Sequence, residues 1–266
     1  MAMEAQEREH SLGGETILQT DGLVKKFGEF TATDHVDFEV KRGEFRSIIG
    51  PNGAGKTTLF NLISGALPVT EGTIYFDGED ITDLSAPQRV RRGIGRSFQI
   101  SNVFGGLSVR ENVRLAAQSV HRDEYGFFES LFKTTDQYEE MNADTDRILE
   151  QVGLADVAEE EADALAYGDR RRLEIGVVLA TDPELVLFDE PTAGMSVEET
   201  QGTIDLIEEV LVDQTLLLIE HDIELVMNLS DSITVLNRGE ILAEGTPEEV
   251  ANDQAVQDAY LGGMIE

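Results

Sequence analysis

Residues 50–58 have the sequence Gly50-Pro51-Asn52-Gly53-Ala54-Gly55-Lys56-Thr57-Thr58, and this stretch decides the fold. It matches the pattern G-x-x-x-x-G-K-[ST]. It follows a short β-rich run, Phe45 to Ile49, and precedes a predicted helix from Lys56 to Ser64. Glycines let successive backbone N–H groups approach a phosphate without interference from Cβ, at a helix N-terminus that already favours anions. The stretch therefore predicts a phosphate-binding loop.

Two side chains of this loop have predicted roles toward a nucleoside triphosphate. Lys56 would bridge the β- and γ-phosphates, and the Thr57 hydroxyl would ligate Mg²⁺. The alternative is a glycine-rich turn that contains a lysine by chance. The flanking strand and helix favour the phosphate loop, and so does the scarcity of lysine, which occurs only five times in the chain.

Two further buried strands of a parallel sheet are predicted from apolar runs. Leu185–Phe188 and Leu216–Ile219 are continuous apolar runs, typical of strands covered on both faces. Val36, Phe38 and Val40 repeat with period two, which indicates a half-buried strand in the N-terminal part. These patterns predict an α/β core with an N-terminal β part.

Further elements follow from local signals. A strand over 72–76 leads into a tight turn at Asp77-Gly78, and a hairpin is predicted from Ile233–Leu236 to Ile241–Ala243. Ser196 and Glu199 have the spacing of a capping box that opens a helix to about Val212. Residues 108–180 have helical periodicity, as at Val109, Val113, Leu115 and Ala116, then Ile148, Val152 and Leu154. We expect a polar tail over 1–15 and one domain over 16–266, with a helical subdomain inserted at about 100–168.

Two carboxylates, Asp189 and Glu190, directly follow the apolar run that ends at Phe188. In phosphate-loop NTPases this strand end lies beside the loop, so Asp189 is the expected second protein ligand of Mg²⁺. Glu190 would then face the γ-phosphate and polarise the attacking water. An ordinary acidic strand end is the alternative in a chain this acidic, and the upstream loop favours the functional interpretation.

Composition excludes several classes of protein. The chain has 266 residues, 53 acidic and 20 basic residues, a formal charge of −33 and no cysteine. A disulfide scaffold and thiol catalysis are therefore excluded, and net repulsion argues against a nucleic-acid surface. No apolar stretch approaches the roughly 20 residues of a membrane span, and residues 1–15 do not resemble a secretory signal, so we expect a cytoplasmic protein. The acidity also suggests adaptation to a cytoplasm of very high salt.

The order and spacing of five features resemble the ATPases of ABC transporters over about Leu18 to Gly262. They are the phosphate loop, Gln99, the segment Leu165-Ala166-Tyr167-Gly168-Asp169, the pair Asp189-Glu190, and His221. The resemblance implies a phosphate-loop NTPase core of the ABC ATPase type that binds ATP with Mg²⁺. Its N-terminal part would be an antiparallel β-sheet, with an inserted α-helical subdomain.

The resemblance also implies residue roles. Phe27 would stack on adenine, Gln99 would contact Mg²⁺ or water and sense the membrane partner, and His221 would contact the γ-phosphate. The signature residues Ala166, Tyr167, Gly168 and Asp169 of one subunit would close over ATP bound to a second ATPase subunit, either an identical copy or a paralogue.

Two departures from the commonest family pattern bear on these roles. The usual signature Leu-Ser-Gly-Gly-Gln has Ala166 at its serine position, so the hydroxyl that would reach the γ-phosphate is missing. Backbone N–H groups at the following helix N-terminus would still contact an anion. Ser196 stands where many members have an aspartate.

A narrower likeness is to the larger ATPase subunit of branched-chain amino-acid importers. It rests on residues 165–175, on Gly95–Gln99, on Ala193-Gly194-Met195, on Ile219–Asp222 and on Ala259–Gly262. It implies two membrane permease subunits, an extracytoplasmic solute-binding protein and a position on the inner face of the membrane. The run Arg170–Arg172 would form an electrostatic face of the subunit interface. A urea or short-chain amide importer, a soluble ABC ATPase outside transport, and a nucleotide-binding regulator without turnover are the alternatives.

Overall fold

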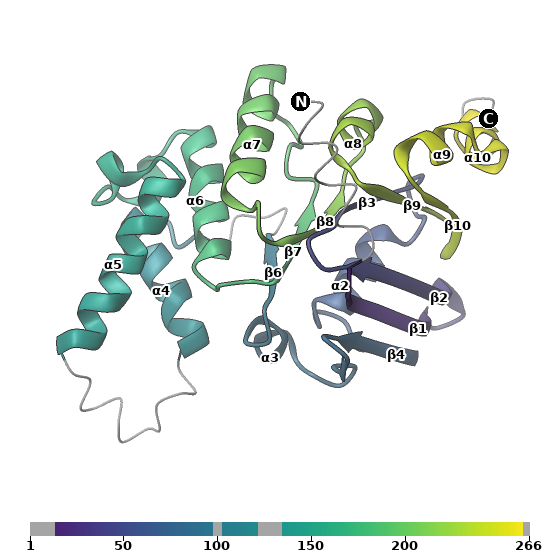
Figure 1. The fold of residues 1–266 in the computed structure, drawn as a ribbon, viewed down its shortest axis with the longest axis horizontal. Helices are drawn as coiled ribbons and strands as arrows, with labels where there is room; N and C mark the ends of the chain where they lie inside the picture. Colours follow the sequence, from purple (N-terminus) through teal and green to yellow (C-terminus); the bar gives the residue numbers. More distant parts are fainter. Residues whose placement is uncertain (1–13, 98–102, 122–134, 263–266) are drawn as a thin grey trace. The chain divides into compact units, whose positions relative to one another are not determined.

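The computed structural model describes residues 14–97, 103–121 and 135–262. They form two compact units. The first comprises Met1–Arg89, Leu185–Glu190 and Asp213–Glu266, and the second comprises Val90–Glu184 and Pro191–Val212. Each unit is described by itself, and its elements are labelled in Figure 1.

An antiparallel sheet makes up the N-terminal part of the first unit. Its strands, in the order β2-β1-β4-β5, are β1 (Thr16–Phe27), β2 (Phe30–Lys41), β4 (Glu71–Phe76) and β5 (Glu79–Asp80). Val36, Phe38 and Val40 of β2 are all buried, as their period of two predicts. The predicted tight turn lies between β4 and β5, where Asp77 and Gly78 both have positive φ.

Parallel strands form the centre of the first unit. They are β3 (Phe45–Ile49), β7 (Leu185–Asp189), β8 (Thr215–Ile219) and β9 (Ser232–Asn237), in the order β9-β3-β8-β7. Every residue of β7 and β8 is buried, which confirms the two predicted apolar strands. β10 (Glu240–Gly245) pairs antiparallel with β9 and completes the predicted hairpin. Parallel strands end at one edge of a sheet, so the segments after β3, β7 and β8 emerge together.

Helices pack against this sheet within the first unit. They are α2 (Lys56–Ile63), α8 (Ile223–Leu229), α9 (Pro247–Asn252) and α10 (Gln254–Gly262), with α3 (Ala86–Val90) at the end of the first segment. Val226, Val250 and Val256, from α8, α9 and α10, form one apolar cluster with Ile233 and Val235 of β9. The C-terminal helices are therefore part of the core of this unit.

The second unit is mainly helical. It contains β6 (Ile94–Ser97), α4 (Val109–His121), α5 (Thr135–Gln151), α6 (Tyr167–Leu179) and α7 (Val197–Val210), with 3₁₀ turns at Ala155–Val157 and Ala162–Ala164. Val109, Val113, Ile148 and Val152 are buried, as helical periodicity predicts. Leu115 also lies in α4 but is 42% exposed, because it is off the buried stripe of the helix.

Helix α7 begins as its sequence predicts. Ser196 caps the helix by accepting a hydrogen bond from the Glu199 N–H, and the Glu199 carboxylate accepts one from the Ser196 N–H. The helix ends at Val210, two residues before the predicted Val212. The subdomain limits of about 100–168 stay a prediction.

No helix among the described residues is both long enough and apolar enough to span a bilayer.

Candidate nucleotide-binding site

The phosphate loop connects β3 to α2, as the sequence predicts. Gly55 is the N-cap of α2 with φ 106°, and no side chain caps the helix. A helix N-terminus leaves backbone N–H groups without intrahelical partners, and these groups favour an anion. Residues 51–53, 57 and 58 are exposed or half-buried, so the rim of the loop is open to a ligand.

Two glycines of the loop are required by close backbone contacts. A Cβ on Gly50 would lie 2.1 Å from the Leu236 carbonyl oxygen, and a Cβ on Gly55 would lie 2.6 Å from that of Ala32. The N–H of Gly239, in the β9–β10 turn, donates to the Ala54 carbonyl at 2.9 Å. Neighbouring backbone thus fixes the loop conformation before any ligand binds. The sequence interpretation missed the supports at Ala32 and Gly239, because neither residue carries a motif.

The Lys56 side chain is held by its own loop. It is 6% exposed, and its ammonium donates to the carbonyls of Gly50 at 2.7 Å and Pro51 at 3.3 Å. Burial lowers the pKa of Lys56, while the charges of Glu190 and Asp189 oppose that shift. An anionic phosphate oxygen is a stronger acceptor than a neutral carbonyl, so Lys56 is poised to exchange one for the other.

The carboxylates and the histidine lie at the same edge of the sheet. Asp189, the last residue of β7, is 2% exposed. Glu190 follows it in the left-handed region with φ 51°, and its N–H donates to the Ile219 carbonyl of β8 at 2.8 Å. The Glu190 Oε1 and the His221 Nε2 are 2.9 Å apart, at hydrogen-bond distance. A positive φ is a strained backbone conformation for a residue other than glycine, and such strain is often found at functional sites.

Hard oxygen donors are available for a divalent cation. Thr57 in the first turn of α2 is exposed, and Asp189 contributes a buried carboxylate close enough to Lys56 to affect its pKa. No group of three or more His, Cys, Asp or Glu residues among those described could hold a metal. A hydroxyl and one carboxylate fit Mg²⁺, which is commonly bound by one or two carboxylates together with substrate phosphates and water.

Phe27 occupies an exposed position at the end of β1. Its side chain is 47% exposed, and the Lys25 ammonium lies 5.2 Å from the ring centroid. Phe30, which pairs with Phe27 across the β1–β2 turn, is 62% exposed. An exposed aromatic face in this position is available for stacking.

The signature segment lies in the second unit, at the start of α6. Ala166 is the N-cap and no side chain caps the helix, so its first backbone N–H groups are available to an anion. Tyr167 is 57% exposed, and its hydroxyl donates to the Ala193 carbonyl at 3.3 Å. Gly168 has open space around its Cα, and Asp169 lies in the first turn.

The side chains of Arg170–Arg172 do not share one exposed face, because the three have different environments, and a role of the run in the subunit interface stays a prediction. Arg171 is buried and pairs with Glu174 one turn along α6. Arg172 donates to the Val152 carbonyl at 3.1 Å, and Arg170 lies 3.6 Å from the Asp163 carboxylate. These interactions fasten α6 within its own unit.

Gln99 lies outside the described residues.

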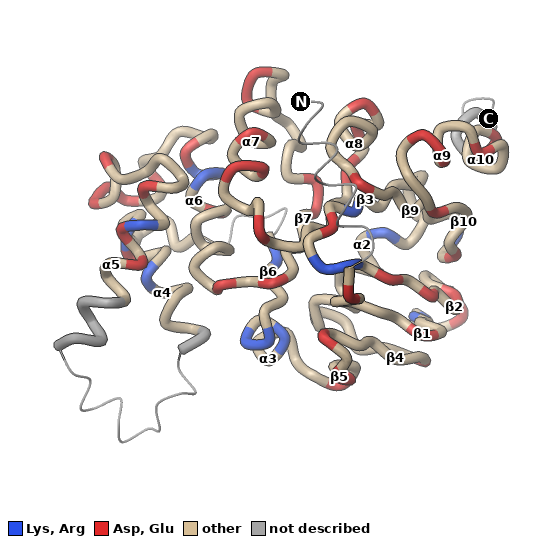
Figure 2. The backbone as a smooth tube through the Cα atoms, in the orientation of Figure 1, with Lys and Arg blue, Asp and Glu red and all other residues tan. Residues whose placement is uncertain are grey.

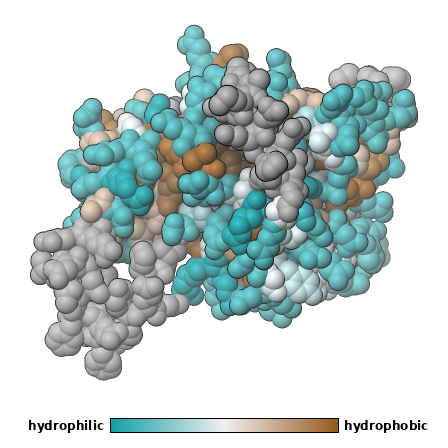
Figure 3. All heavy atoms as spheres, viewed as in Figure 1, coloured by the Kyte–Doolittle hydropathy of each residue, from teal (hydrophilic) through white to brown (hydrophobic). Residues whose placement is uncertain are grey.

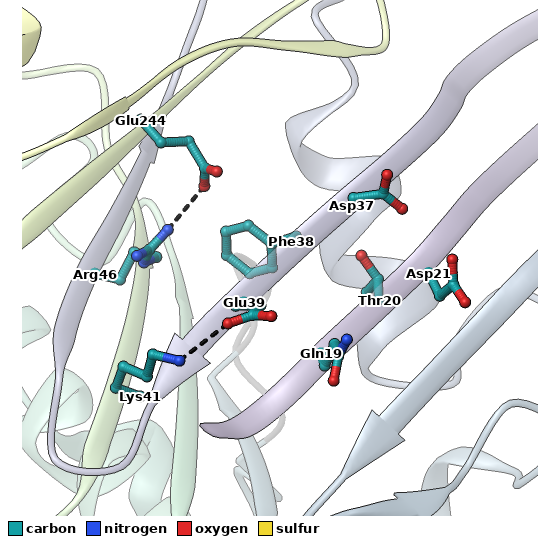
Figure 4. A pocket seen from close by; sticks show the side chains of 9 residues that line it. All are labelled: Gln19, Thr20, Asp21, Asp37, Phe38, Glu39, Lys41, Arg46 and Glu244. Atoms are coloured by element: carbon teal, nitrogen blue, oxygen red, sulfur yellow. Dashed lines mark hydrogen bonds and ion pairs between the residues drawn. The ribbon is translucent and has the colours of Figure 1, made fainter. Parts of the chain in front are cut away.

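A groove of about 560 Å³ in the first unit is separate from the motif residues (Figure 4). It lies over β1 and β2, and four of its nine lining residues are acidic while two are basic. Both of its cations are paired, Lys41 with Glu39 at 3.0 Å and Arg46 with Glu244 at 2.8 Å. The groove therefore lacks the positive charge that a phosphate ligand needs.

Comparison with protein families gives two matches. Residues 33–193 match the model described as ABC transporter, and residues 240–265 match the model described as branched-chain amino acid ATP-binding cassette transporter. The second match covers β10, α9 and α10.

Individual relatives of the chain have descriptions that agree with these two family matches. The chain is 41% identical to the high-affinity branched-chain amino acid transport ATP-binding protein LivG of Escherichia coli, over 92% of this chain and 98% of the relative. It is also 41% identical to BraF of Pseudomonas aeruginosa, a protein of the same description, with the same coverage.

Solved structures confirm the predicted fold class. A nucleotide-free ATP-binding cassette from an ABC transporter matches with a TM-score of 0.79 and 34% identity, over 92% of this chain and 99% of that one. A dimeric ATP-binding cassette bound to ADP and phosphate matches with a TM-score of 0.71 and 27% identity, over 87% of this chain and 99% of that one.

The loop geometry predicts unequal costs for two glycine substitutions. Gly50→Ala should lower the free energy of unfolding by about 3 kcal/mol, because its Cβ overlaps the Leu236 carbonyl. Gly53→Ala is the matched control, since Gly53 has φ 79° but nothing within 4 Å of a Cβ. Its cost should be about 1 kcal/mol, from the left-handed conformation alone. Urea unfolding of both variants measures the difference, and equal costs would contradict the proposed packing of the loop.

Proposed function

The chain belongs to the ABC transporter family, and from this premise we propose that it is the ATP-hydrolysing subunit of a branched-chain amino-acid importer. Membership of this family implies ATP hydrolysis that is coupled to transport. The observation that carries the proposal is the edge of the parallel sheet where the phosphate loop, Asp189 and the hydrogen-bonded pair of Glu190 and His221 emerge from neighbouring strands. The C-terminal family match and the relatives LivG and BraF support the solute class.

ATP binding follows from the groups around α2. The backbone of residues 50–58 and the Lys56 ammonium would hold the β- and γ-phosphates, with Lys56 moving from loop carbonyls to phosphate oxygens. Phe27 would stack on adenine. Thr57, Asp189 and Gln99 would hold Mg²⁺, which neutralises phosphate charge when bound.

Hydrolysis needs a base beside the γ-phosphate, and Glu190 is the proposed one. As the water oxygen attacks the γ-phosphorus, its proton passes to the Glu190 carboxylate and the bond to the bridging oxygen of ADP breaks. His221, 2.9 Å from Glu190, would orient that carboxylate and contact the γ-phosphate. The products are ADP and inorganic phosphate.

Coupling to transport requires further subunits. A second ATPase subunit, identical or paralogous, would contribute the N-terminus of its α6, including Ala166, Tyr167, Gly168 and Asp169, to close the site. The dimeric ADP- and phosphate-bound relative supports such an assembly. Two permease subunits would dock near Gln99, an extracytoplasmic binding protein would deliver the solute, and the chain would sit on the cytoplasmic face of the membrane.

The role of Glu190 is tested by Glu190→Gln, which keeps the shape of the side chain and removes the proton acceptor. We expect ATP hydrolysis to fall at least about 100-fold while the Kd for ATP stays within about twofold. Phosphate release and fluorescent-nucleotide binding measure the two quantities. Glu224→Gln, at an exposed position of α8, is the control that should behave as wild type. Hydrolysis at the wild-type rate by Glu190→Gln would refute the assigned base.

The solute class is tested by uptake in source cells whose only copy carries Lys56→Ala. Labelled leucine uptake should be lost, because the variant cannot hold the phosphates, while labelled urea uptake continues. If only urea uptake were lost, the assignment as a transport ATPase would stand and the assigned solute would change from branched-chain amino acids to urea. If uptake of neither solute changed, both the transport role and the solute class would be refuted.

The same proposal includes a high-salt working environment. Among the described residues, only three carboxylates are buried, Glu44, Asp189 and Glu220. Acidic residues occur in both units in Figure 2, for example on α5, α7, α8 and α9, and hydrophilic residues dominate the face in Figure 3. Self-repulsion from a charge of −33 opposes folding in dilute buffer, whereas at 1 M salt the Debye length is about 3 Å.

Thermal stability should therefore rise steeply with KCl between about 0.1 M and 2 M. A control with five exposed acids changed to amides has a charge of −33 + 5 = −28 and should show a shallower rise. The five positions are Glu150, Asp156, Glu160, Asp213 and Glu224. Melting curves in KCl measure both slopes, and a wild-type Tm independent of salt would refute the adaptation.

A further inference from the structure

Arg89, in α3, is one of the largest fully buried side chains among the described residues, at 1% exposed. Its guanidinium donates hydrogen bonds to four backbone carbonyls. Nη1 reaches Leu62 at 2.6 Å and Ile63 at 2.8 Å, Nη2 reaches Thr82 at 2.8 Å, and Nε reaches Leu84 at 3.0 Å. The side chain thus joins two separate backbone segments.

One of these segments is the end of the phosphate-loop helix. Leu62 and Ile63 are the last two residues of α2, which begins at Lys56. The final carbonyls of a helix have no partner within the helix, and Arg89 donates to two of them, of which the Leu62 carbonyl also accepts from the Gly65 N–H at 3.2 Å. The other segment, Thr82 to Leu84, follows β5, so Arg89 anchors the far end of α2 to the antiparallel sheet region.

The charge on Arg89 suits this position. Burial lowers the pKa of Arg89 to about 10, opposed by the charges of Asp80 and Asp83, so the guanidinium stays charged at neutral pH. A cation at a helix C-terminus interacts favourably with the helix dipole. Helix α2 has eight residues, so the cation and the phosphate loop lie at opposite ends of a helix about 12 Å long.

The surrounding backbone leaves room for the guanidinium and for little else. Gly65, just past α2, has φ 74°, and a Cβ there would lie 3.0 Å from both the Arg89 Nε and the Ala86 N. A side chain at Gly65 would displace Arg89 or the start of α3.

We propose that Arg89 is a positioning residue for nucleotide binding, which holds the C-terminal end of α2 so that its N-terminal end presents the phosphate loop. The inference rests on the proposed function in one respect, that the phosphates bind at the N-terminus of α2. Arg89 itself does not contact the nucleotide.

The test compares Arg89→Met and Arg89→Lys with the wild-type protein in MgATP hydrolysis and in binding of a fluorescent ADP analogue. Arg89→Met should raise KM and Kd about three- to tenfold, from the lost anchor and helix-end charge, while kcat stays within about twofold. Arg89→Lys keeps the charge but reaches fewer carbonyls, so its KM should rise less.

Two further variants separate positioning from general destabilisation. Leu149→Ala removes a buried side chain of α5 in the second unit and should lower Tm without changing KM. Lys56→Ala should abolish nucleotide binding, and if it does not, the proposed phosphate site itself fails.

If Lys56→Ala loses binding while folded Arg89→Met binds nucleotide like the wild type, the inference about Arg89 is overturned and the proposed function stands. If Arg89→Met does not fold, Arg89→Lys decides the question, since an unchanged KM overturns the inference and a raised KM with unchanged kcat supports it.

Discussion

The candidate site depends on the backbone packing around the phosphate loop. Leu236 and Ala32 approach so near that neither Gly50 nor Gly55 has room for a Cβ, and Gly239 adds a hydrogen bond to Ala54. The contacts come from β2 and from the β9–β10 hairpin, which are distant in sequence. The phosphate loop is therefore preorganised by tertiary structure, and backbone N–H groups need little rearrangement to receive an anion.

The parallel sheet gives the same edge its chemical groups. β3 leads into the loop, β7 ends at Asp189, and β8 leads to His221, so that the hydrogen-bonded pair of Glu190 and His221 joins two neighbouring strands. Helix α2 then has a defined role at each end. Its N-terminus carries Lys56 and the loop, and its C-terminus is tied down by Arg89.

Sequence patterns predicted the parts of this arrangement that depend on local or periodic signals. The apolar strands, the capping box at Ser196 and the loop at residues 50–57 all have such signals, and the structure contains each of them. The roles of Arg89, Ala32 and Gly239 depend on contacts between distant segments, for which one sequence holds no signal. The arginine run lacks one common exposed face for a related reason. Three adjacent residues of a helix point about 100° apart, so Arg171 is buried while its neighbours reach other partners.

A chain with a charge of −33 repels a polyanion such as ATP, yet its phosphate loop must bind one. The two are compatible because the repulsion acts over long distances and the binding contacts act over short ones. The acidic residues are spread over the surface, where salt screens charges separated by more than a Debye length. The Lys56 ammonium and the backbone N–H groups of the loop act at hydrogen-bond distance, and there screening by salt is weak. Lys56 is also buried, and its hydrogen-bond acceptors among the described residues are the neutral carbonyls of its own loop. Molar salt would thus suppress the long-range repulsion of ATP while leaving the short-range attraction nearly intact, so an acidic surface and a phosphate site are compatible in one protein.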